Sequence, residues 1–158
     1  MMLTIRALRP NDLPALIEME RAAPTAAHWR ESEYEMLLAS DAAPLRKTFV
    51  AEKHGQPVGF VVAKIVVKDW EIENIIVRAG CQRQGIGRLL LSHLIEEARS
   101  GDAQQILLEV RSSNAAAKNL YASCGFSVVG GRRAYYHNPE DDAVLYKLDP
   151  AESQGRNA

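Results

Sequence analysis

The sequence predicts an α/β (α+β) fold with a mixed, mostly antiparallel central sheet of about seven strands, flanked by about four helices. Three observations indicate this class. Short β-rich stretches end at turn signals, amphipathic helical patterns stand between some of them, and the order of elements implies one parallel crossover. The length of 158 residues fits one domain, which we expect at residues 1–150. Residues 151–158 have few apolar side chains, so we expect a flexible C-terminal tail there.

The N-terminal part predicts one strand followed by two helices. Residues 3–9 (LTIRALR) are rich in strand-forming residues. Pro10 and Asn11 then mark a helix start, and the helical pattern continues to Glu20. A second, short helix is expected at residues 31–39.

Three strands should follow in the middle of the chain. The β-rich stretches 48–53 and 57–67 flank His54-Gly55, a turn signal that favours an antiparallel hairpin. A further strand is expected at residues 70–77. These strands supply most of the antiparallel sheet.

The longest helix is expected between Gly85 and Gly101-Asp102. Its apolar residues recur at three-to-four spacing, as an amphipathic helix requires. They are Ile86, Leu89, Leu90, Leu94, Ile95 and Ala98.

The last part of the domain predicts a strand, a helix and two more strands. Residues 106–110 (ILLEV) form a short apolar strand, and Asn114 can cap the helix that we expect at residues 115–124. The final strands fit residues 126–132 and 143–148.

Composition excludes several classes of function. The formal net charge of −1 provides no global field for a nucleic-acid backbone, so we expect no nucleic-acid partner. Cys81 and Cys124 have no nearby Cys or His at metal-ligand spacing, so we expect reduced thiols and no metal. No apolar run approaches the roughly 18 residues of a membrane span, and we expect a cytoplasmic protein without membrane contact.

The segment QRQGIGR stands between a strand and a helix, where unpaired backbone N–H groups and the helix dipole attract an anion. Its glycines would let a pyrophosphate approach the backbone closely. The segment consists of Gln82, Arg83, Gln84, Gly85, Ile86, Gly87 and Arg88. Arg78 adds positive charge nearby, and residues 75–95 contain no carboxylate.

Two known glycine motifs do not fit this segment. Neither Lys-Ser nor Lys-Thr follows Gly87, which excludes a P-loop, and Leu90 stands where a dinucleotide fingerprint requires a small residue. Taken alone, two glycines can also serve plain loop geometry. The segment therefore needs support from elsewhere in the chain.

That support comes from the tract LEVRSSNAAAKNLYASCGF at residues 108–126. Together with Gln82-x-x-Gly85-x-Gly87 at a helix start, it strongly resembles the GCN5-related N-acetyltransferases, abbreviated GNAT. Within that family the chain looks most like the RimI-type ribosomal-protein-alanine N-acetyltransferases. The resemblance covers residues 70–148 well and residues 1–60 in outline.

The resemblance implies the GNAT fold and acetyl-CoA as the cosubstrate. Backbone amides at residues 82–88 would hold the coenzyme pyrophosphate, and Asn114 would contact the coenzyme. The strand that ends at Ile75, Ile76 and Val77 would separate from its neighbour to receive the pantetheine arm. A backbone N–H near Val77 would then face the thioester carbonyl.

Glu109 interrupts an otherwise apolar strand and, with Arg111, points to the face opposite Ile106. By the resemblance Glu109 is the general base, acting through water. An ion pair between Glu109 and Arg111 is the alternative role. Glu73, on the strand that leads to Val77, is a competing base.

Tyr121 lies two helical turns after Asn114, on the same side of the predicted helix. By the resemblance this tyrosine protonates the departing coenzyme thiolate. Alternatively, Tyr121 packs the helix on the sheet together with Leu120 and Cys124.

The acceptor side is indicated less directly. Arg132, the pair Tyr135-Tyr136 and the later residues 140–143 resemble the stretch that protein N-terminal acetyltransferases place over the peptide. Tyrosines also simply favour strands. The candidate acceptor-binding residues are Trp29, Glu73, Asn74, Tyr135 and Tyr136.

The resemblance therefore implies transfer of an acetyl group to the N-terminal amine of a protein, by analogy the N-terminal alanine of a small-subunit ribosomal protein. An α-amino group, with a pKa of roughly 8, is deprotonated more easily than lysine at about 10.4. One alternative is an acetyltransferase for a small-molecule amine or an internal lysine, since the fold does not fix the acceptor. Another is a non-catalytic acyl-CoA-binding regulator.

Overall fold

The computed structural model describes residues 2–23, 29–39 and 45–155. These residues form a seven-stranded sheet in the order β1-β2-β3-β4-β5-β7-β6. Its strands are β1 (Leu3–Ala7), β2 (Leu45–Lys53), β3 (Gln56–Val66), β4 (Asp69–Val77), β5 (Gln105–Arg111), β6 (Ser127–Tyr136) and β7 (Asp141–Leu148). Every neighbouring pair is antiparallel except β4 and β5, which are parallel. The predicted mixed, mostly antiparallel sheet is confirmed.

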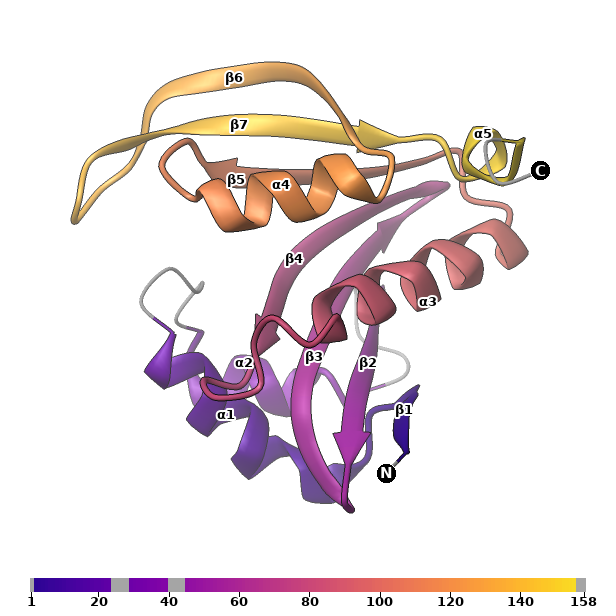
Figure 1. Ribbon diagram of the computed structural model, residues 1–158, viewed down its shortest axis with the longest axis vertical. Coiled ribbons are helices and arrows are strands. Elements are labelled where there is room, and N and C mark those ends of the chain that lie inside the picture. The colour runs from indigo at the N-terminus through magenta and orange to yellow at the C-terminus, as the bar shows by residue number, and fades with distance from the viewer. Residues whose placement is uncertain (1, 24–28, 40–44, 156–158) are drawn as a thin grey trace.

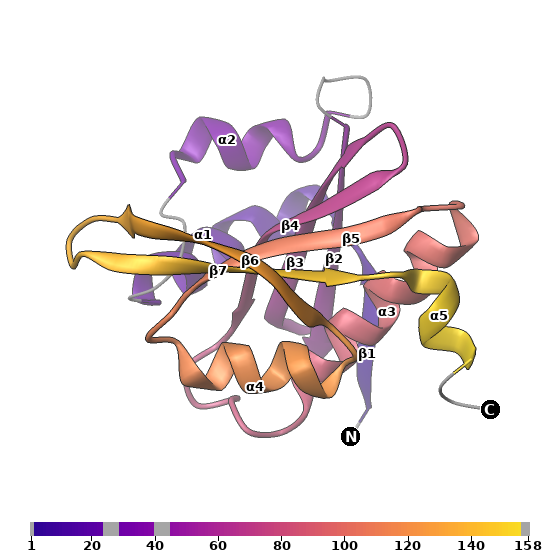
Figure 2. The ribbon, with the colours of Figure 1, turned by 90° about the horizontal axis from the view of Figure 1, so that it is seen from above.

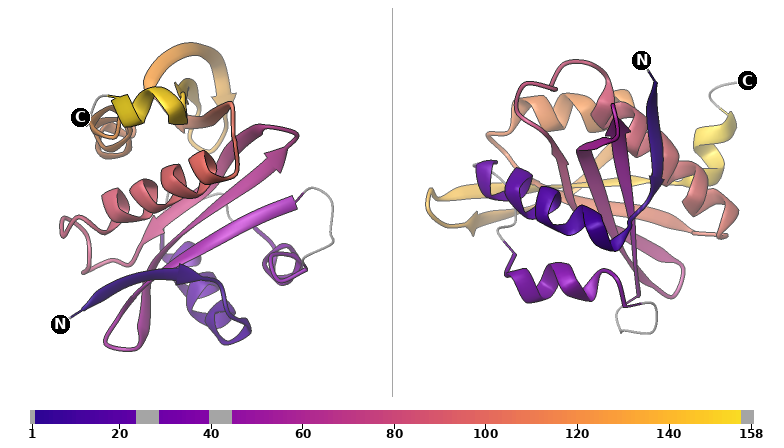
Figure 3. Two further views of the ribbon diagram at one scale, coloured as in Figure 1. Left: turned by 90° about the vertical axis from the view of Figure 1, so that its right-hand side faces the viewer. Right: turned by 90° about the horizontal axis from the view of Figure 1, so that it is seen from below.

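Helices cover both faces of this sheet. They are a 3₁₀ helix (Pro10–Asp12), α1 (Leu13–Ala22), α2 (Glu31–Met36), α3 (Ile86–Ser100), α4 (Ala115–Ser123) and α5 (Pro150–Gly155). Figures 2 and 3 show α1 and α2 on one face and α3 and α4 on the other. Helix α3 is the crossover that joins the parallel strands β4 and β5.

Each face of the sheet has its own apolar core. Under α3 and α4 the core includes Leu90, Leu94 and Ile106, and under α1 and α2 it includes Leu16 and Phe60. The start of α3 lies very close to β3, because a Cβ atom at residue 59 would be 3.2 Å from the Ile86 side chain, as well as 2.9 Å from the carbonyl oxygen of Ile76 on β4. Gly59 therefore lets α3 begin directly above the end of β4.

The strands β4 and β5 separate at one end. They pair only where Asp69–Ile72 faces Gln105–Leu108, and the remainder of each strand diverges from the other. Figure 1 shows the two halves of the sheet spreading apart at this point. A register shift between Val62 and Ala63 in the pairing of β3 with β4 accompanies the divergence. The separation beside Ile75, Ile76 and Val77 that the resemblance implies is present.

Several element boundaries differ from the sequence prediction. Strand β2 begins at Leu45 rather than residue 48, and α2 ends at Met36 rather than residue 39. Strand β6 continues to Tyr136 rather than ending at residue 132, and β7 begins at Asp141 rather than residue 143. The pairing between them is irregular after Arg132, where the backbone N–H of Ala134 donates to the Asp142 carboxylate at 2.7 Å. The Asp142 carboxylate thus takes the place of a backbone carbonyl in the hydrogen bonding between β6 and β7. Strand propensity alone does not reveal such a contact.

Helix α5 is an element that the sequence analysis does not foresee. It occupies residues 150–155, most of which fall in the predicted tail, and it raises the number of α-helices in the described ranges to five. The backbone N–H groups of Ala151 and Glu152 donate to the Asp149 carboxylate at 2.9 and 3.4 Å. Arg99 of α3 donates to the carbonyl of Pro150 at 2.9 Å. A capped start and a contact with α3 explain this helix without a large apolar face.

Candidate active site

The loop before α3 leaves backbone N–H groups available to a ligand. Gly85 precedes the helix in the left-handed conformation with φ +79°, and no side chain caps the first turn. Arg83 also has a positive φ, at 64°. A Cβ atom on residue 87 would lie 3.1 Å from the Leu120 side chain, so this turn packs directly against α4. The loop therefore has the geometry of a helix start that can bind an anion, and it lies beside the opening of the sheet.

The arginines near this loop have different partners. Arg88 donates to the Ser123 hydroxyl at 2.8 Å, which ties α3 to the end of α4. Arg78 donates to the carbonyl of Pro57 at 3.2 Å and pairs with Glu18 at 3.3 Å. The Arg78 guanidinium, one of the cations that the sequence places near the loop, is therefore already bound by residues of α1 and β3.

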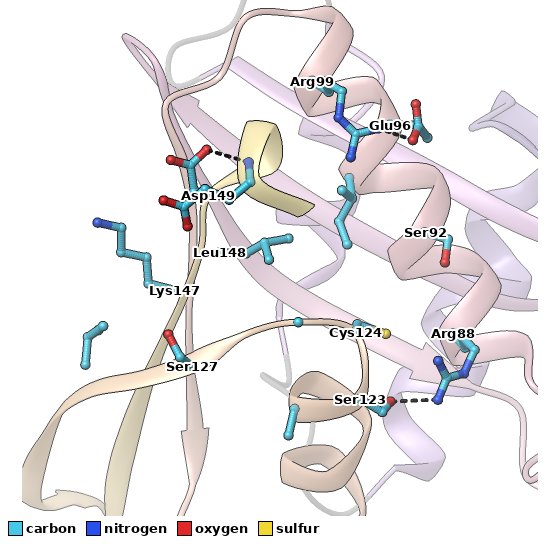
Figure 4. A pocket seen from close by; sticks show the side chains of 15 residues that line it. Arg88, Ser92, Glu96, Arg99, Ser123, Cys124, Ser127, Lys147, Leu148 and Asp149 are labelled. Carbon is cyan, nitrogen blue, oxygen red and sulfur yellow. Dashed lines mark hydrogen bonds and ion pairs between the residues drawn. The ribbon is translucent and has the colours of Figure 1, made fainter. Parts of the chain in front are cut away.

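A groove of about 670 Å³ continues from Arg88 between α3, α4, the end of β7 and α5. Figure 4 shows Arg88, Ser92 and Ser123 at one end of it and Lys147 and Asp149 at the other. Its lining mixes cations, carboxylates and hydroxyls. A polar molecule bound at the α3 loop could extend into this groove.

Glu109 points to the opposite face of β5 from Ile106, Leu108 and Val110, which are buried under α3 and α4. Its carboxylate accepts a hydrogen bond from Arg132 Nε at 3.1 Å, and 24% of its side chain is exposed. The sequence alternative, an ion pair with Arg111, is wrong.

Arg111 is engaged elsewhere. It donates to the carbonyl of Pro139 at 2.9 Å and lies 4.4 Å from the ring centroid of Tyr136. The sequence could not distinguish Arg111 from Arg132, because the actual partner of Glu109 is 23 positions away.

Tyr121 is buried in the core between α4 and the sheet. Its ring packs against Phe126 and Tyr146, with centroids 5.9 and 6.0 Å away. Burial, with a smaller contribution from Tyr136, raises the pKa of the Tyr121 hydroxyl above its usual value. The ring thus packs as the structural alternative requires, and the hydroxyl stays protonated as a proton donor must.

Asn114 begins the helix that carries Tyr121. Its side-chain oxygen accepts from the backbone N–H of Ala117 at 3.1 Å, so the predicted N-cap is confirmed. Because the oxygen is used by the cap, the amide NH₂ is the part of Asn114 that can reach a ligand.

Glu73, the competing base, is held by an arginine. Arg46 donates to its two carboxylate oxygens at 2.7 and 3.3 Å, a bidentate arrangement. The Arg46 guanidinium also lies 5.9 Å from the ring centroid of Trp29. Asn74, the next residue, is buried, and its Nδ2 has no hydrogen-bond partner in the part of the chain that the structure describes.

Three residues that the sequence analysis did not single out as site residues complete this region: Glu20, Tyr34 and Arg46. Glu20 accepts from the backbone N–H of Trp29 at 3.0 Å, and the rings of Trp29 and Tyr34 are 5.5 Å apart. Burial and the nearby Glu20 raise the pKa of Tyr34. The available signal was a carboxylate at position 20 on the apolar face of α1, four residues after Leu16.

The candidate acceptor residues therefore form two groups. Trp29, Glu73 and Asn74 lie on the face covered by α1 and α2, around Arg46 and Tyr34. Tyr135 and Tyr136 lie at the end of β6, with ring centroids 5.1 Å apart. Arg132, 5.5 Å from the ring centroid of Tyr135, joins this second group to Glu109.

The described ranges contain neither a metal-binding cluster nor a membrane-spanning helix. No group of three or more His, Cys, Asp or Glu side chains is arranged to hold a metal ion. No helix in those ranges combines the length and apolar character needed to cross a membrane.

Known proteins resemble this chain over most of its length. The model of the acetyltransferase (GNAT) family matches residues 13–126. The [ribosomal protein bS18]-alanine N-acetyltransferase of Escherichia coli K12 is 37% identical over 147 residues, which cover 92% of this chain and 96% of the relative. The N-alpha-acetyltransferase of Sulfurisphaera tokodaii is 32% identical, with 89% of this chain and 90% of the relative covered.

The fold agrees with a solved structure. The crystal structure of the ribosomal-protein-S18-alanine N-acetyltransferase from Escherichia coli superposes with a TM-score of 0.80 at 34% identity, covering 94% of each chain. The predicted fold class and the resemblance drawn from the two motifs are both confirmed.

Proposed function

Because the chain belongs to the acetyltransferase (GNAT) family, we propose that it transfers the acetyl group of acetyl-CoA to the N-terminal amine of a protein. By analogy with the relatives named for ribosomal protein bS18, the proposed acceptor is the N-terminal alanine of a small-subunit ribosomal protein. The proposed location is the cytoplasm.

The opening between β4 and β5 carries this proposal. It begins at Ile72, just before Ile75–Val77, and the uncapped start of α3 lies beside it. The pyrophosphate of the coenzyme would bind the amides of residues 82–88, and the pantetheine arm would lie along residues 75–77. The Asn114 amide would hold the arm from the α4 side.

The proposed reaction is direct attack on the thioester. The acceptor ammonium pairs with the Glu109 carboxylate and loses a proton to it through a bridging water, and the neutral amine then attacks the carbonyl carbon. A backbone N–H near Val77 stabilises the oxyanion that forms. When the carbon–sulfur bond breaks, Tyr121 gives its proton to the coenzyme thiolate. The attacking nitrogen loses its second proton to water as the amide forms, and water returns a proton to the Tyr121 phenolate.

An α-amino group is a better acceptor than a lysine side chain when the base is a carboxylate. The acceptor must be neutral when it attacks, and an α-amino group near pKa 8 needs less help than a side-chain amine at about 10.4. Trp29, Glu73 and Asn74 would line one side of the acceptor, and Tyr135 and Tyr136 the other.

A competition assay tests the acceptor class. The protein, with acetyl-CoA, would receive an equimolar mixture of an alanine-initiated peptide, an N-terminally blocked peptide with one lysine, and a panel of small amines. We expect the free N-terminus to be acetylated first. Exclusive acetylation of the lysine or of a small amine would reject the proposal, and tight coenzyme binding without any turnover would indicate an acyl-CoA-binding regulator.

A further inference from the structure

Arg132 lies between the solvent and the candidate base. Its Nε is 3.1 Å from a carboxylate oxygen of Glu109, and 57% of the arginine side chain is exposed against 24% for the glutamate. Its guanidinium also lies 5.5 Å from the ring centroid of Tyr135. A cationic group therefore already occupies one of the oxygens that an incoming ammonium would contact.

The sheet is arranged so that this arginine can reach Glu109. Strand β7 separates β6 from β5, and Arg132 lies opposite its small residue Ala143. Glu109 lies opposite Leu145, whose partner on β6 is Gly130, a residue without a side chain. With no bulky β6 side chain beside Leu145, the long arginine can cross β7 to the carboxylate.

We propose that Arg132 is a positioning residue that occupies the Glu109 carboxylate until the ammonium of the acceptor displaces it. This inference rests on the proposed function, in which Glu109 receives the acceptor proton. Exchange of one cation for another leaves the carboxylate paired throughout, and an exposed ion pair is weak enough to be replaced. The ring of Tyr135 gives the released guanidinium a second partner.

The exchange adds a requirement to the acceptor. Only a group that arrives as a cation can compete with a guanidinium for Glu109, so protonated amines are favoured over neutral nucleophiles such as hydroxyl groups. Arg132 thereby increases the selectivity of the proposed site for amines over neutral acceptors.

Steady-state kinetics with an alanine-initiated peptide test this role. In Arg132→Gln we expect the peptide KM to fall about fivefold, the upper range for one exposed ion pair, while kcat stays within about twofold. Arg132→Lys keeps a competing cation and should restore a KM near that of the wild type. Arg133→Gln removes the same charge from the neighbouring residue and should change neither constant.

The controls separate this inference from a structural role and from the proposed function. A structural role would lower kcat or raise KM in Arg132→Gln, and Arg132→Met, which keeps the apolar stem, should reproduce the decrease in KM. Wild-type turnover with an unchanged or raised KM in both variants overturns the role of Arg132 alone. Absence of wild-type turnover on every peptide overturns the proposed function as well.

Discussion

Two side chains with contrasting surroundings carry the proposed chemistry. Glu109 is partly exposed and paired with Arg132, so it can exchange protons with water. Tyr121 is buried, and burial raises the pKa of its hydroxyl, so this group carries its proton when the coenzyme thiolate forms. The same fold thus provides one group suited to accept a proton and one suited to donate it.

Tyr121→Phe tests the proton donor. The ring should still pack against Phe126 and Tyr146, so acetyl-CoA affinity measured by calorimetry should stay within about twofold, while kcat falls by about a hundredfold, the usual size of a general-acid contribution. Tyr146→Phe removes a hydroxyl from the adjacent ring and is the matched control. Turnover at the wild-type rate in Tyr121→Phe would exclude the acid role.

Glu109→Gln and Glu73→Gln together identify the base. Because Arg46 binds both oxygens of Glu73, we expect the larger loss of kcat, about a hundredfold, in Glu109→Gln. Glu73→Gln should mainly raise the peptide KM, since it loosens Arg46 beside Trp29. The reverse order of kcat losses would make Glu73 the base.

At the residue scale, the sequence offers candidates for the reacting residues but not the partners that surround them. Glu109 and Tyr121 lie in a contiguous motif, so their type and spacing are visible in the chain. The ion pairs that hold the two glutamates join residues 23 and 27 positions apart. They form because Arg132 of β6 reaches across β7 to β5, and Arg46 of β2 reaches across β3 to β4. No local pattern specifies them.

Among the elements, the start of α3 and the end of β4 form the proposed coenzyme site. Their positions could be predicted because Gly85 and Gly87 stand between the β-rich stretch at residues 70–77 and the amphipathic pattern of the following helix. Strand β6 and helix α5 were harder to foresee, because each depends on a carboxylate that binds backbone N–H groups, Asp142 in one case and Asp149 in the other. Apolar periodicity does not report such interactions.

Gly87→Glu tests the anion site at the α3 start. A carboxylate there would bind the same N–H groups as the pyrophosphate and repel it, so we expect acetyl-CoA affinity to fall by about a hundredfold or more. Calorimetry with acetyl-CoA gives the measurement. Val128→Glu adds the same charge to an exposed position on β6 and should bind normally. If Gly87→Glu binds acetyl-CoA with wild-type affinity, the coenzyme does not bind at this loop.

Across the whole molecule, a charged network fastens the first strand to the sheet. Arg6 of β1 donates to Asp12 at 2.7 and 2.8 Å and pairs with Glu52 of β2 at 3.1 Å. The hydrogen bonds from Arg6, helped by the backbone N–H of Arg9, lower the pKa of Asp12 below its usual value. The network links the N-terminal segment, where the family resemblance is weakest, to the sheet.

This network predicts a specific dependence of stability on pH. Asp12 has a lower pKa in the folded than in the unfolded chain, so its stabilisation is fully present above about pH 5 and disappears as the pH falls through the folded pKa. Asp12→Asn should lower the free energy of unfolding at pH 7 by about 2 kcal/mol and flatten the loss of stability below about pH 4. Denaturant titrations at several pH values check both effects.

The exposed Asp102 provides the control for this prediction. Its side chain is 89% exposed and pairs only weakly with Lys68 at 3.3 Å. Asp102→Asn should leave the curve of stability against pH unchanged. An equally steep acid limb in Asp12→Asn would show that other carboxylates determine the acid stability.

The central claim is that the chain acetylates a protein α-amine, and one peptide tests it directly. The peptide carries a free N-terminal alanine and one internal lysine, and after incubation with the protein and acetyl-CoA it is fragmented in a mass spectrometer. We predict a single acetyl group on the alanine nitrogen, formed only when acetyl-CoA is present. An acetyl group on the lysine alone, or no acetylation at all, would contradict the claim.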